Sequence, residues 1–170
     1  MLHVALYQPS IPPNTGNIGR TCVGMGAGLH LIGPVAFDLS DHAVKRAGLD
    51  YWEHLKLTVH PTPDAFVDWL GGREPWLVTK FGDVRFDQAA YGGDDVLIFG
   101  NENTGIPQAW HERWAGRRVS IPIPGKVRSY NVANTVAIVL AQAMVKAGDR
   151  EAGYETGARD GRGAGEVKAV

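Results

Sequence analysis

The residues best suited to chemistry lie in the segment 117–145, RRVSIPIPGKVRSYNVANTVAIVLAQAMV. Apolar residues alternate along its first part, which predicts a strand over 118–123 that stops at its prolines, because proline cannot donate to a sheet ladder. Gly125 then allows a sharp reversal or a close approach of the backbone to a ligand. Lys126 and Arg128 place two cations on this short loop, so we expect an anionic group to bind there.

Polar side chains open the helix that this segment predicts over 130–146. Ser129, Asn131 and Asn134 surround its first turn, where unpaired backbone amides favour a negative or polar ligand. The alternative is structural, since Ser129 or Asn131 could serve only as the N-cap of the helix. The segment as a whole predicts a polar pocket at the end of a strand.

A second cluster, PSIPPNTGNIGR at 9–20, follows the first predicted strand and leads into a predicted helix over 16–26. Asn14 can cap this helix, and Gly16 can let the backbone approach a ligand. Arg20 lies about one helical turn beyond Gly16 and can project a cation back toward the edge of the sheet. The alternative is a capped helix with a solvent-exposed arginine.

The third cluster, FGNENTGIP at 99–107, is again a strand followed by a polar loop that glycines bound. Gly100 and Gly105 permit a tight bend that would present backbone amides and carbonyls to an adenine or a ribose. Glu102 is the only charged residue of the loop. A plain surface turn is the alternative.

The glycines of GMGAGL at 24–29 look like a dinucleotide-binding fingerprint, but their context argues against that function. A true fingerprint follows a strand and opens a helix, whereas these glycines end a predicted helix and lead into the strand LHLIG. We therefore expect them to cap the helix and to allow close packing. A nucleotide-dependent oxidoreductase is the rival hypothesis that they suggest.

The stretch HAVKRAGLDYW at 42–52 combines basic and aromatic residues. Lys45 and Arg46 with Tyr51 and Trp52 suit contact with the phosphates and bases of RNA. Packing of the two aromatic rings into the core is the alternative. The six histidines have no metal-ligand spacing, so we assign them no role and expect no metal.

Predicted strands alternate with predicted helices along residues 1–147. The strand candidates are 2–7, 29–33, 55–59, 75–80, 95–99 and 118–123. The helix candidates are 16–26, 41–47, 63–70, 107–114 and 130–146. This alternation predicts an α/β fold with a mostly parallel sheet and helices on both faces.

The composition, 44% hydrophobic and 21% charged over 170 residues, fits one soluble domain. The net charge is −1, so an RNA partner would need a local basic patch or a site shared by two subunits. The one cysteine, Cys22, excludes an intrachain disulfide, and a reducing cytoplasm is the expected compartment. No segment is long enough to span a bilayer, so we expect no membrane partner.

The last residues differ in composition from the rest. Residues 148–170 are rich in glycine and in charges of both signs and almost free of aliphatic side chains, so they cannot bury enough surface to fold. We expect a disordered tail after a domain that covers 1–147.

The three clusters together resemble the SPOUT superfamily of S-adenosylmethionine-dependent RNA methyltransferases. The resemblance is carried by NTGNIGR at 14–20, FGNENTGIP at 99–107 and IPIPGKVRSYNVANTVAI at 121–138, whose order and spacing also match. The chain is most similar to the small tRNA wobble-position ribose 2'-O-methyltransferases of the TrmL/YibK type. Its segments LYQPSIPPNTGNIGR, LHLIGP and KRAGLDYW resemble signatures of that group. Asn101 departs from this group, which often has proline there, and the loop 125–127 is shorter and more cationic.

The resemblance implies a C-terminal trefoil knot that binds S-adenosyl-L-methionine, and a homodimer formed through the first and last helices. It also implies that the anticodon stem-loop of tRNA is the substrate. By similarity, the cofactor pocket is formed by Val78, Thr79, Gly100, Glu102, Gly105, Ile121, Ile123 and Ser129. Substrate contacts are expected from Asn14, Arg20, Lys45, Arg46 and Arg128.

Arg20 resembles the catalytic arginine of the family. Methyl transfer is an in-line displacement, so positioning the ribose oxygen behind the methyl group supplies much of the rate. Because a guanidinium keeps its proton in water, we expect Arg20 to orient the substrate phosphate and to stabilise the developing alkoxide, while Ser129 and Asn131 position the hydroxyl and the donor. A direct role of Arg20 as the base is the alternative. Methylation at another tRNA or rRNA site and a non-catalytic RNA-binding module are the rival functions.

Overall fold

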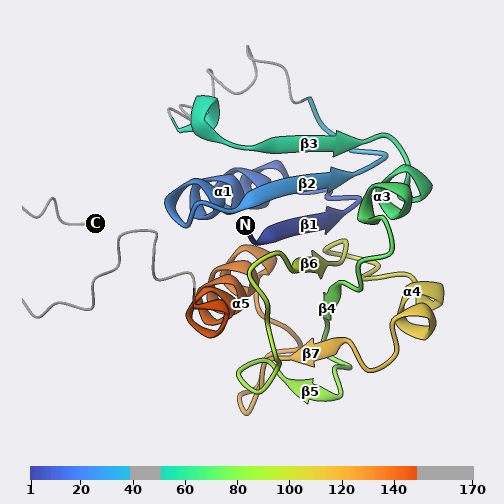
Figure 1. The fold of residues 1–170 in the computed structure, drawn as a ribbon, viewed down its shortest axis with the longest axis vertical. Helices are drawn as coiled ribbons and strands as arrows, with labels where there is room; N and C mark the ends of the chain where they lie inside the picture. Colours follow the sequence, from blue (N-terminus) through green and yellow to red (C-terminus); the bar gives the residue numbers. More distant parts are fainter. Residues whose placement is uncertain (39–50, 149–170) are drawn as a thin grey trace, which may run out of the picture.

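The computed structural model describes residues 1–38 and 51–148. Within these residues the core is a seven-stranded sheet in the order β3-β2-β1-β6-β4-β7-β5, with parallel pairing between neighbours (Figure 1). The strands are β1 His3–Tyr7, β2 Gly28–Ile32, β3 Leu57–His60, β4 Trp76–Val78, β5 Val84–Arg85, β6 Val96–Phe99 and β7 Arg118–Ser120. A parallel sheet covered on both faces needs strands that are apolar throughout, and β2, β4 and β6 are buried at every position.

Helices cover both faces of the sheet. They are α1 Pro12–Gly24, α3 Pro63–Leu70, α4 Gln108–Arg113 and α5 Val132–Ala147, with a short 3₁₀ helix η1 at Trp52–His54. α1 and α5 lie side by side on one face, and α3 and α4 lie against the other (Figure 1). The strand register divides the core between them: Leu6 and Phe99 pair on the side of α1 and α5, whereas Ala5 and Ile98 pair on the side of α3 and α4.

The predicted α/β fold with a parallel sheet between two layers of helices is confirmed. Each predicted strand is present, and the helix predicted over 63–70 has those bounds. The strand predicted over 118–123 is shorter than expected, because it ends at Ser120, two residues before the first proline. The strand β5 was missed, since two residues carry no periodic signal.

The first helix begins earlier than predicted, at Pro12 and not at residue 16. Proline suits the first turn of a helix, where the missing amide has no partner to lose. The predicted helix 41–47 and the tail after Gly148 lie outside the described residues, so they stay predictions. Gly148 itself ends α5 in the left-handed conformation, at φ 71°.

The glycines of GMGAGL have structural roles, as predicted. α1 ends at Gly24, Gly26 adopts a left-handed φ of 65°, and Gly28 opens β2. A Cβ atom on Gly28 would lie 2.9 Å from the His3 ring, so close packing requires glycine there. These residues form no phosphate-binding turn between a strand and a helix.

Three histidines, to which the sequence assigned no role, form a hydrogen-bonded row across β1, β2 and β3. Nδ1 of His3 is 2.9 Å from Nε2 of His30, and Nδ1 of His30 is 3.0 Å from Nε2 of His60. Trp69 lies over the row, with its ring centroid 4.1 Å from that of His30. Burial lowers the pKa of all three, and that of His30 falls to about 3. The row is therefore neutral in the native protein at neutral pH.

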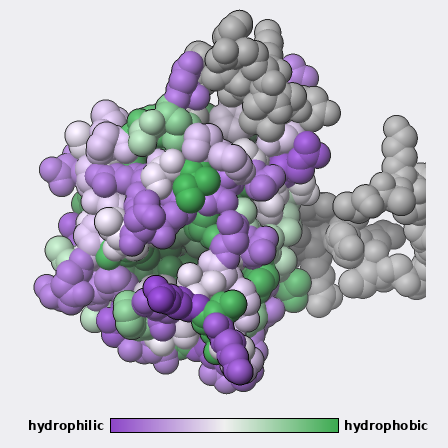
Figure 2. Space-filling view, turned by 180° about the vertical axis from the view of Figure 1, so that it is seen from behind, coloured by the Kyte–Doolittle hydropathy of each residue, from purple (hydrophilic) through white to green (hydrophobic). Residues whose placement is uncertain are grey.

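The surface has small apolar patches among hydrophilic side chains on the face shown in Figure 2. Among residues 1–38 and 51–148, no helix has the length and apolar character needed to cross a membrane. In the same residues, no group of histidine, cysteine and carboxylate side chains is placed to hold a metal ion.

Candidate active site

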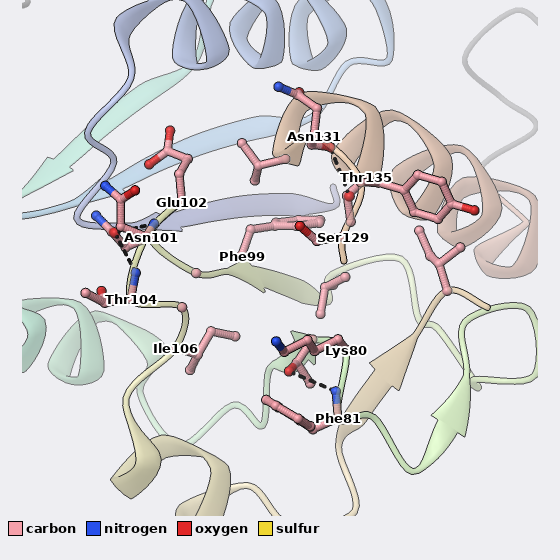
Figure 3. A pocket seen from close by; sticks show the side chains of 18 of the residues that line it. Lys80, Phe81, Phe99, Asn101, Glu102, Thr104, Ile106, Ser129, Asn131 and Thr135 are labelled. Carbon is pink, nitrogen blue, oxygen red and sulfur yellow. Dashed lines mark hydrogen bonds between the residues drawn. The ribbon is translucent and has the colours of Figure 1, made fainter. Parts of the chain in front are cut away.

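A cavity of about 630 Å³ lies where the segments that follow β1, β4, β6 and β7 meet at the edge of the sheet (Figure 3). Buried side chains at the strand ends, Val78 and Phe99, form part of its wall. Predicted site residues from all three clusters and from the end of β4 line it: Asn14, Val78, Thr79, Gly100, Glu102, Gly105, Ile121, Ile123, Ser129 and Asn131. The tertiary structure thus gathers the three clusters around one cavity.

The carboxylate of Glu102 holds the first cluster in place. Its Oε2 accepts hydrogen bonds from the amide and the hydroxyl of Ser10, both at 3.0 Å. Its Oε1 accepts from the amide of Ile11 at 3.3 Å and from Nδ2 of Asn14 at 3.1 Å. Burial alone would raise the pKa of Glu102, but the hydrogen bonds from Ser10 and Asn14 hold it below its ordinary value. Glu102 is therefore an anion that organises residues 10–14.

Asn14 links the first cluster to the third. Its Oδ1 accepts a hydrogen bond from Nδ2 of Asn131 at 3.0 Å. The prediction that Asn14 caps the first helix was wrong, because the N-cap is Ile11, without a side-chain cap, and Asn14 lies inside the first turn. The side chain of Asn14 bridges Glu102 and Asn131 instead of bonding its own helix.

Asn131 combines the two roles that the sequence left open. It is the N-cap of α5, since its Oδ1 accepts from the amide of Ala133 at 2.8 Å. It also lines the cavity and donates to Asn14 through its other side-chain atom. The cap thereby fixes the side chain in the orientation that faces the first cluster.

The loop 100–105 forms the tight bend that its glycines predicted. Gly105 has φ 75°, and a Cβ atom on Gly100 would lie 2.4 Å from the carbonyl carbon of Gly105. Oδ1 of Asn101 accepts from the amides of Asn103 and Thr104 at 2.8 and 3.0 Å. Asn101 and Gly105 also exchange two backbone hydrogen bonds. We expected the amides of this loop to face a nucleoside. The amides of Asn101, Asn103, Thr104 and Gly105 instead donate hydrogen bonds within the loop.

The third cluster is irregular between β7 and α5. Ser129 lies at the cavity, in an exposed position, and the hydroxyl of its neighbour Tyr130 donates to the carbonyl of Pro122 at 3.3 Å. Lys126 and Arg128 are exposed and are not among the lining residues of the cavity. Lys45 and Arg46 lie outside the described residues, so their predicted contacts remain predictions.

Arg20 does not line the cavity of its own chain. It lies on the exposed side of α1, with its guanidinium 4.6 Å from the ring centroid of Tyr51. The hydroxyl of Tyr51 donates to the carbonyl of Gly16 at 2.6 Å, and Trp52 packs so close to Gly19 that a Cβ there would lie 3.2 Å from its ring. Tyr51 and Trp52 therefore pack against α1 as half-buried rings, and neither lies in the core.

Sequence reasoning missed several lining residues. Lys80 and Phe81 follow β4, and His111 lies on α4. His111 is buried, and its Nδ1 has no hydrogen-bond partner among the described residues. Burial lowers the pKa of His111, and the nearby Arg118 lowers it further. Their segments had no distinctive spacing, and the one signal that the sequence offers is a lysine next to a phenylalanine at the end of a predicted strand.

Comparison with known proteins identifies the family of this chain. The profile of the SpoU rRNA Methylase family matches residues 1–141. The chain belongs to this family. This SpoU methylase is 42% identical over 161 residues to the tRNA (cytidine(34)-2'-O)-methyltransferase of Burkholderia cenocepacia (strain HI2424). The match covers 93% of this chain and 100% of the relative.

Two solved structures are similar to this SpoU methylase. One, described as giving structural insights into the 2-OH methylation of C/U34 on tRNA, has a TM-score of 0.79 at 39% identity, covering 88% of this chain and 98% of its own. The other is the SpoU methyltransferase AviRb from Streptomyces viridochromogenes with the cofactor AdoMet, at TM-score 0.73 and 29% identity, covering 90% and 59%. The predicted membership of an RNA methyltransferase family is confirmed.

Proposed function

We propose that this SpoU methylase transfers the methyl group of S-adenosyl-L-methionine to the ribose 2'-hydroxyl of the wobble nucleotide, cytidine or uridine 34, of tRNA. The observation that carries the proposal is the cavity at which three clusters, joined by the hydrogen bonds of Glu102, Asn14 and Asn131, meet. A relative that is 42% identical and covered in full is named for this reaction, which supports the choice of substrate.

The cavity fits the cofactor in its chemistry. Val78, Phe99 and Ile106 give it buried apolar walls, which suit a purine. The unpartnered Nδ1 of His111 offers a polar contact that the described residues do not satisfy. We assign cofactor binding to the residues expected from the sequence, Val78, Thr79, Gly100, Gly105, Ile121, Ile123 and Ser129, with Glu102 shaping their site. The bound cofactor supplies an electrophilic methyl group on a sulfonium.

The residues of the chain then position the ribose and manage its proton. Glu102 accepts four hydrogen bonds, so we assign it the positioning of residues 10–14 and not the removal of the proton. Ser129 and Asn131 line the cavity, and we assign to them the orientation of the hydroxyl. Arg20 orients the phosphate and stabilises the developing negative charge on the 2'-oxygen. The 2'-hydroxyl gives its proton to a water molecule; in the alternative mechanism, a neutral Arg20 side chain accepts it as the base.

A methylation assay tests this function. Purified protein, methyl-labelled S-adenosylmethionine and tRNA transcripts should give label at nucleotide 34, and a transcript with 2'-deoxyribose at 34 should receive none. Label at another tRNA or rRNA position would support the alternative substrate. RNA binding without transfer would support a binding module. Tight binding of NAD without binding of S-adenosylhomocysteine would restore the oxidoreductase hypothesis.

We infer further that the active unit is a homodimer that pairs through α1 and α5. Arg20 does not line the cavity of its own chain, and we therefore propose that the Arg20 that acts on the substrate comes from a second copy. On α5, Ile138 and Val145 are exposed at 39% and 69%, and their spacing of seven residues places them on one side of the helix. A dimer would cover these apolar side chains and complete the site.

Complementation between Arg20→Ala and Gly100→Ala tests the dimer, at a cofactor concentration too low to fill the Gly100→Ala site. An Arg20→Ala copy keeps its cavity, and a Gly100→Ala copy keeps Arg20. Random pairing of equal amounts should restore about a quarter of the wild-type activity, because half of the dimers are mixed and each mixed dimer has one complete site. Sedimentation that shows a fully active monomer would overturn the dimer, whatever the folding of either variant.

The tRNA surface is proposed to include Lys45, Arg46 and Arg128, gathered from both copies. The reason is electrostatic: a chain with net charge −1 has no overall field to attract the anticodon stem-loop, so local cations have to do so. Arg46→Ala should weaken tRNA binding and reduce its salt dependence. Deleting the tail after Gly148 should leave dimerisation intact. We place this reaction in the cytoplasm, with its tRNA substrate.

We also propose that the segment from β7 to α5 forms the trefoil knot expected from the resemblance. The strand order supports it, since β7 pairs between β4 and β5, both of which precede it in the chain. The chain then crosses to α5, whose Val136 packs in the same cluster as Ala89 and Tyr91 from the segment between β5 and β6. Pulling the chain from both ends should give a contour length shorter than a fully extended chain, because a knot retains residues.

A further inference from the structure

Phe81 lies at the rim of the cavity, on the loop that follows β4 (Figure 3). Its side chain is 66% exposed, whereas those of Phe66 and Phe99 are at most 1% exposed. An exposed phenyl ring forgoes the stabilisation that burial brings, and a ring at the mouth of a binding cavity is open to contact with a ligand. Neither the cofactor assignment nor the proposed catalytic residues uses this ring.

The loop holds Phe81 in a defined position. Its amide donates to Oγ1 of Thr79 at 3.2 Å, a bond drawn in Figure 3. The next residue, Gly82, lies so close to β7 that a Cβ there would be 2.2 Å from the carbonyl carbon of Val119. The hydroxyl of Ser120 also donates to the carbonyl of Gly82 at 3.3 Å. A ring on a fixed loop loses little freedom when a ligand stacks on it.

A cation accompanies the ring. Nζ of Lys80 lies 5.0 Å from the ring centroid of Phe81. A nucleotide presents a flat base next to a phosphate, so an aromatic face beside an ammonium matches both of its parts.

We propose that Phe81 is the stacking platform for the pyrimidine base of the nucleotide that is methylated, and that Lys80 contacts its phosphate. The inference rests on the proposed function and names the subsite that receives the substrate. The target base is a better occupant than the adenine of the cofactor, because the interior already offers apolar walls in Val78 and Ile106, at 8% and 9% exposure. A base that belongs to an RNA loop enters from solvent and meets the rim first.

A binding cycle tests the platform. The RNA is an anticodon stem-loop with either cytidine or an abasic ribose at position 34, and its Kd is measured by fluorescence anisotropy with S-adenosylhomocysteine present. Phe81→Ala should raise the Kd of the cytidine RNA roughly 5- to 150-fold, as for loss of one stacked base. The Kd of the abasic RNA should change less than about 3-fold, because that RNA has no base to stack. Phe81→Tyr should keep the wild-type values.

A matched surface variant and a cofactor measurement separate base stacking from a general effect of losing an apolar side chain. Val59 lies on β3, and its side chain is apolar and 49% exposed. Val59→Ala should change the Kd of neither the cytidine RNA nor the abasic RNA. If calorimetry shows instead that Phe81→Ala weakens the binding of S-adenosylhomocysteine, the phenyl ring contacts the cofactor and the inference is wrong. An equal loss with both RNAs, or no loss with either, also overturns it. Absence of methyl transfer by the unchanged protein would overturn the proposed function, and this inference with it.

Discussion

Asn131 donates from Nδ2 to Oδ1 of Asn14 at 3.0 Å, across 117 residues of sequence. Asn14 in turn donates to Glu102 at 3.1 Å, so one chain of side chains joins the segments after β1, β6 and β7. Each of these side chains lines the cavity. Their geometry therefore depends on one another, and a change at one should be felt at the other two.

The first prediction concerns this chain of hydrogen bonds. Asn131→Ala removes the N-cap of α5 and the bond to Asn14, and should lower the free energy of unfolding by about 1–2 kcal/mol. Methyl transfer should fall as well, because the first cluster loses its anchor. The matched control is Thr62→Ala, which removes the N-cap of α3, where the Thr62 hydroxyl accepts from the amide of Ala65 at 3.2 Å. It should cost similar stability in urea unfolding without loss of turnover.

Adding Asn14→Ala to this experiment measures the coupling. If the two asparagines act through their shared bond, the double variant should lose less stability and activity than the sum of the single changes. Additive losses would show that the bond between them has no functional weight.

The second prediction concerns Glu102. Glu102→Gln keeps the shape but replaces one acceptor oxygen with a donor, so at least one of the four hydrogen bonds is lost. We expect a loss of about 1–3 kcal/mol at pH 7. The native pKa of Glu102 lies below its ordinary value, so its contribution is present above the ordinary pKa and disappears as the pH falls through the native one. Urea unfolding across pH should show the two proteins converging in acid; a constant difference would contradict this account.

The third prediction compares two glycines. A Cβ on Gly100 would lie 2.4 Å from the backbone of Gly105, whereas a Cβ on Gly125 would have no heavy atom within 4 Å. Gly100→Ala should therefore distort the loop and lower the affinity for S-adenosylhomocysteine by more than about tenfold, which corresponds to about 1.4 kcal/mol of binding free energy. Gly125→Ala should leave the affinity unchanged in calorimetry. Equal behaviour of the two variants would show that the bend at 100–105 does not shape the cofactor site.

The fourth prediction concerns Arg20. Arg20→Ala should abolish methyl transfer and keep cofactor affinity within about tenfold, because its work is on the RNA and in the transition state. Ser129→Ala should be milder, since a lost neutral hydrogen bond costs about 1 kcal/mol. Single-turnover rates and calorimetry measure the two properties. Parallel loss of both by Arg20→Ala would mark Arg20 as a structural residue of α1, through its contact with Tyr51.

The fifth prediction concerns acid stability. His30 has a native pKa of about 3, depressed by burial, against 6.5 in the unfolded chain. Below pH 6.5, His30 therefore binds a proton in the unfolded state but not in the native state. The free energy of unfolding falls for this reason as the pH drops toward 3. His30 should contribute a loss of about 2 kcal/mol between about pH 6.5 and about pH 5, at about 1.36 kcal/mol per pH unit.

Replacing the histidine tests this origin. His30→Leu should reduce the pH dependence of urea unfolding in that range, even if it lowers stability at pH 7 by leaving the ring nitrogens of His3 and His60 unpaired. His54→Leu is the control, because the side chain of His54 is 69% exposed, and it should leave the slope unchanged. An unchanged slope in His30→Leu would place the acid sensitivity elsewhere.

The order of strands and helices could be read from the sequence because it depends on local patterns. Apolar runs such as Val96–Phe99 and polar, glycine-bounded loops such as 100–105 carry their structure in neighbouring residues. The resemblance to the SPOUT superfamily then predicted that residues of the second and third clusters would share one pocket with the end of β4, as expected where parallel strands end at one edge of a sheet. For this reason the cavity lining could be anticipated in large part.

Only the tertiary structure decided which atoms those residues bond. Asn14 has the sequence position of a cap, yet its partners Glu102 and Asn131 are 88 and 117 residues away. The histidine row joins neighbouring strands whose histidines are 27 and 30 residues apart, and the exposed side of α1 that carries Arg20 follows from how that helix packs. Hydrogen bonds and burial are properties of surfaces brought together by folding, and local propensity contains no information about partners at such separations.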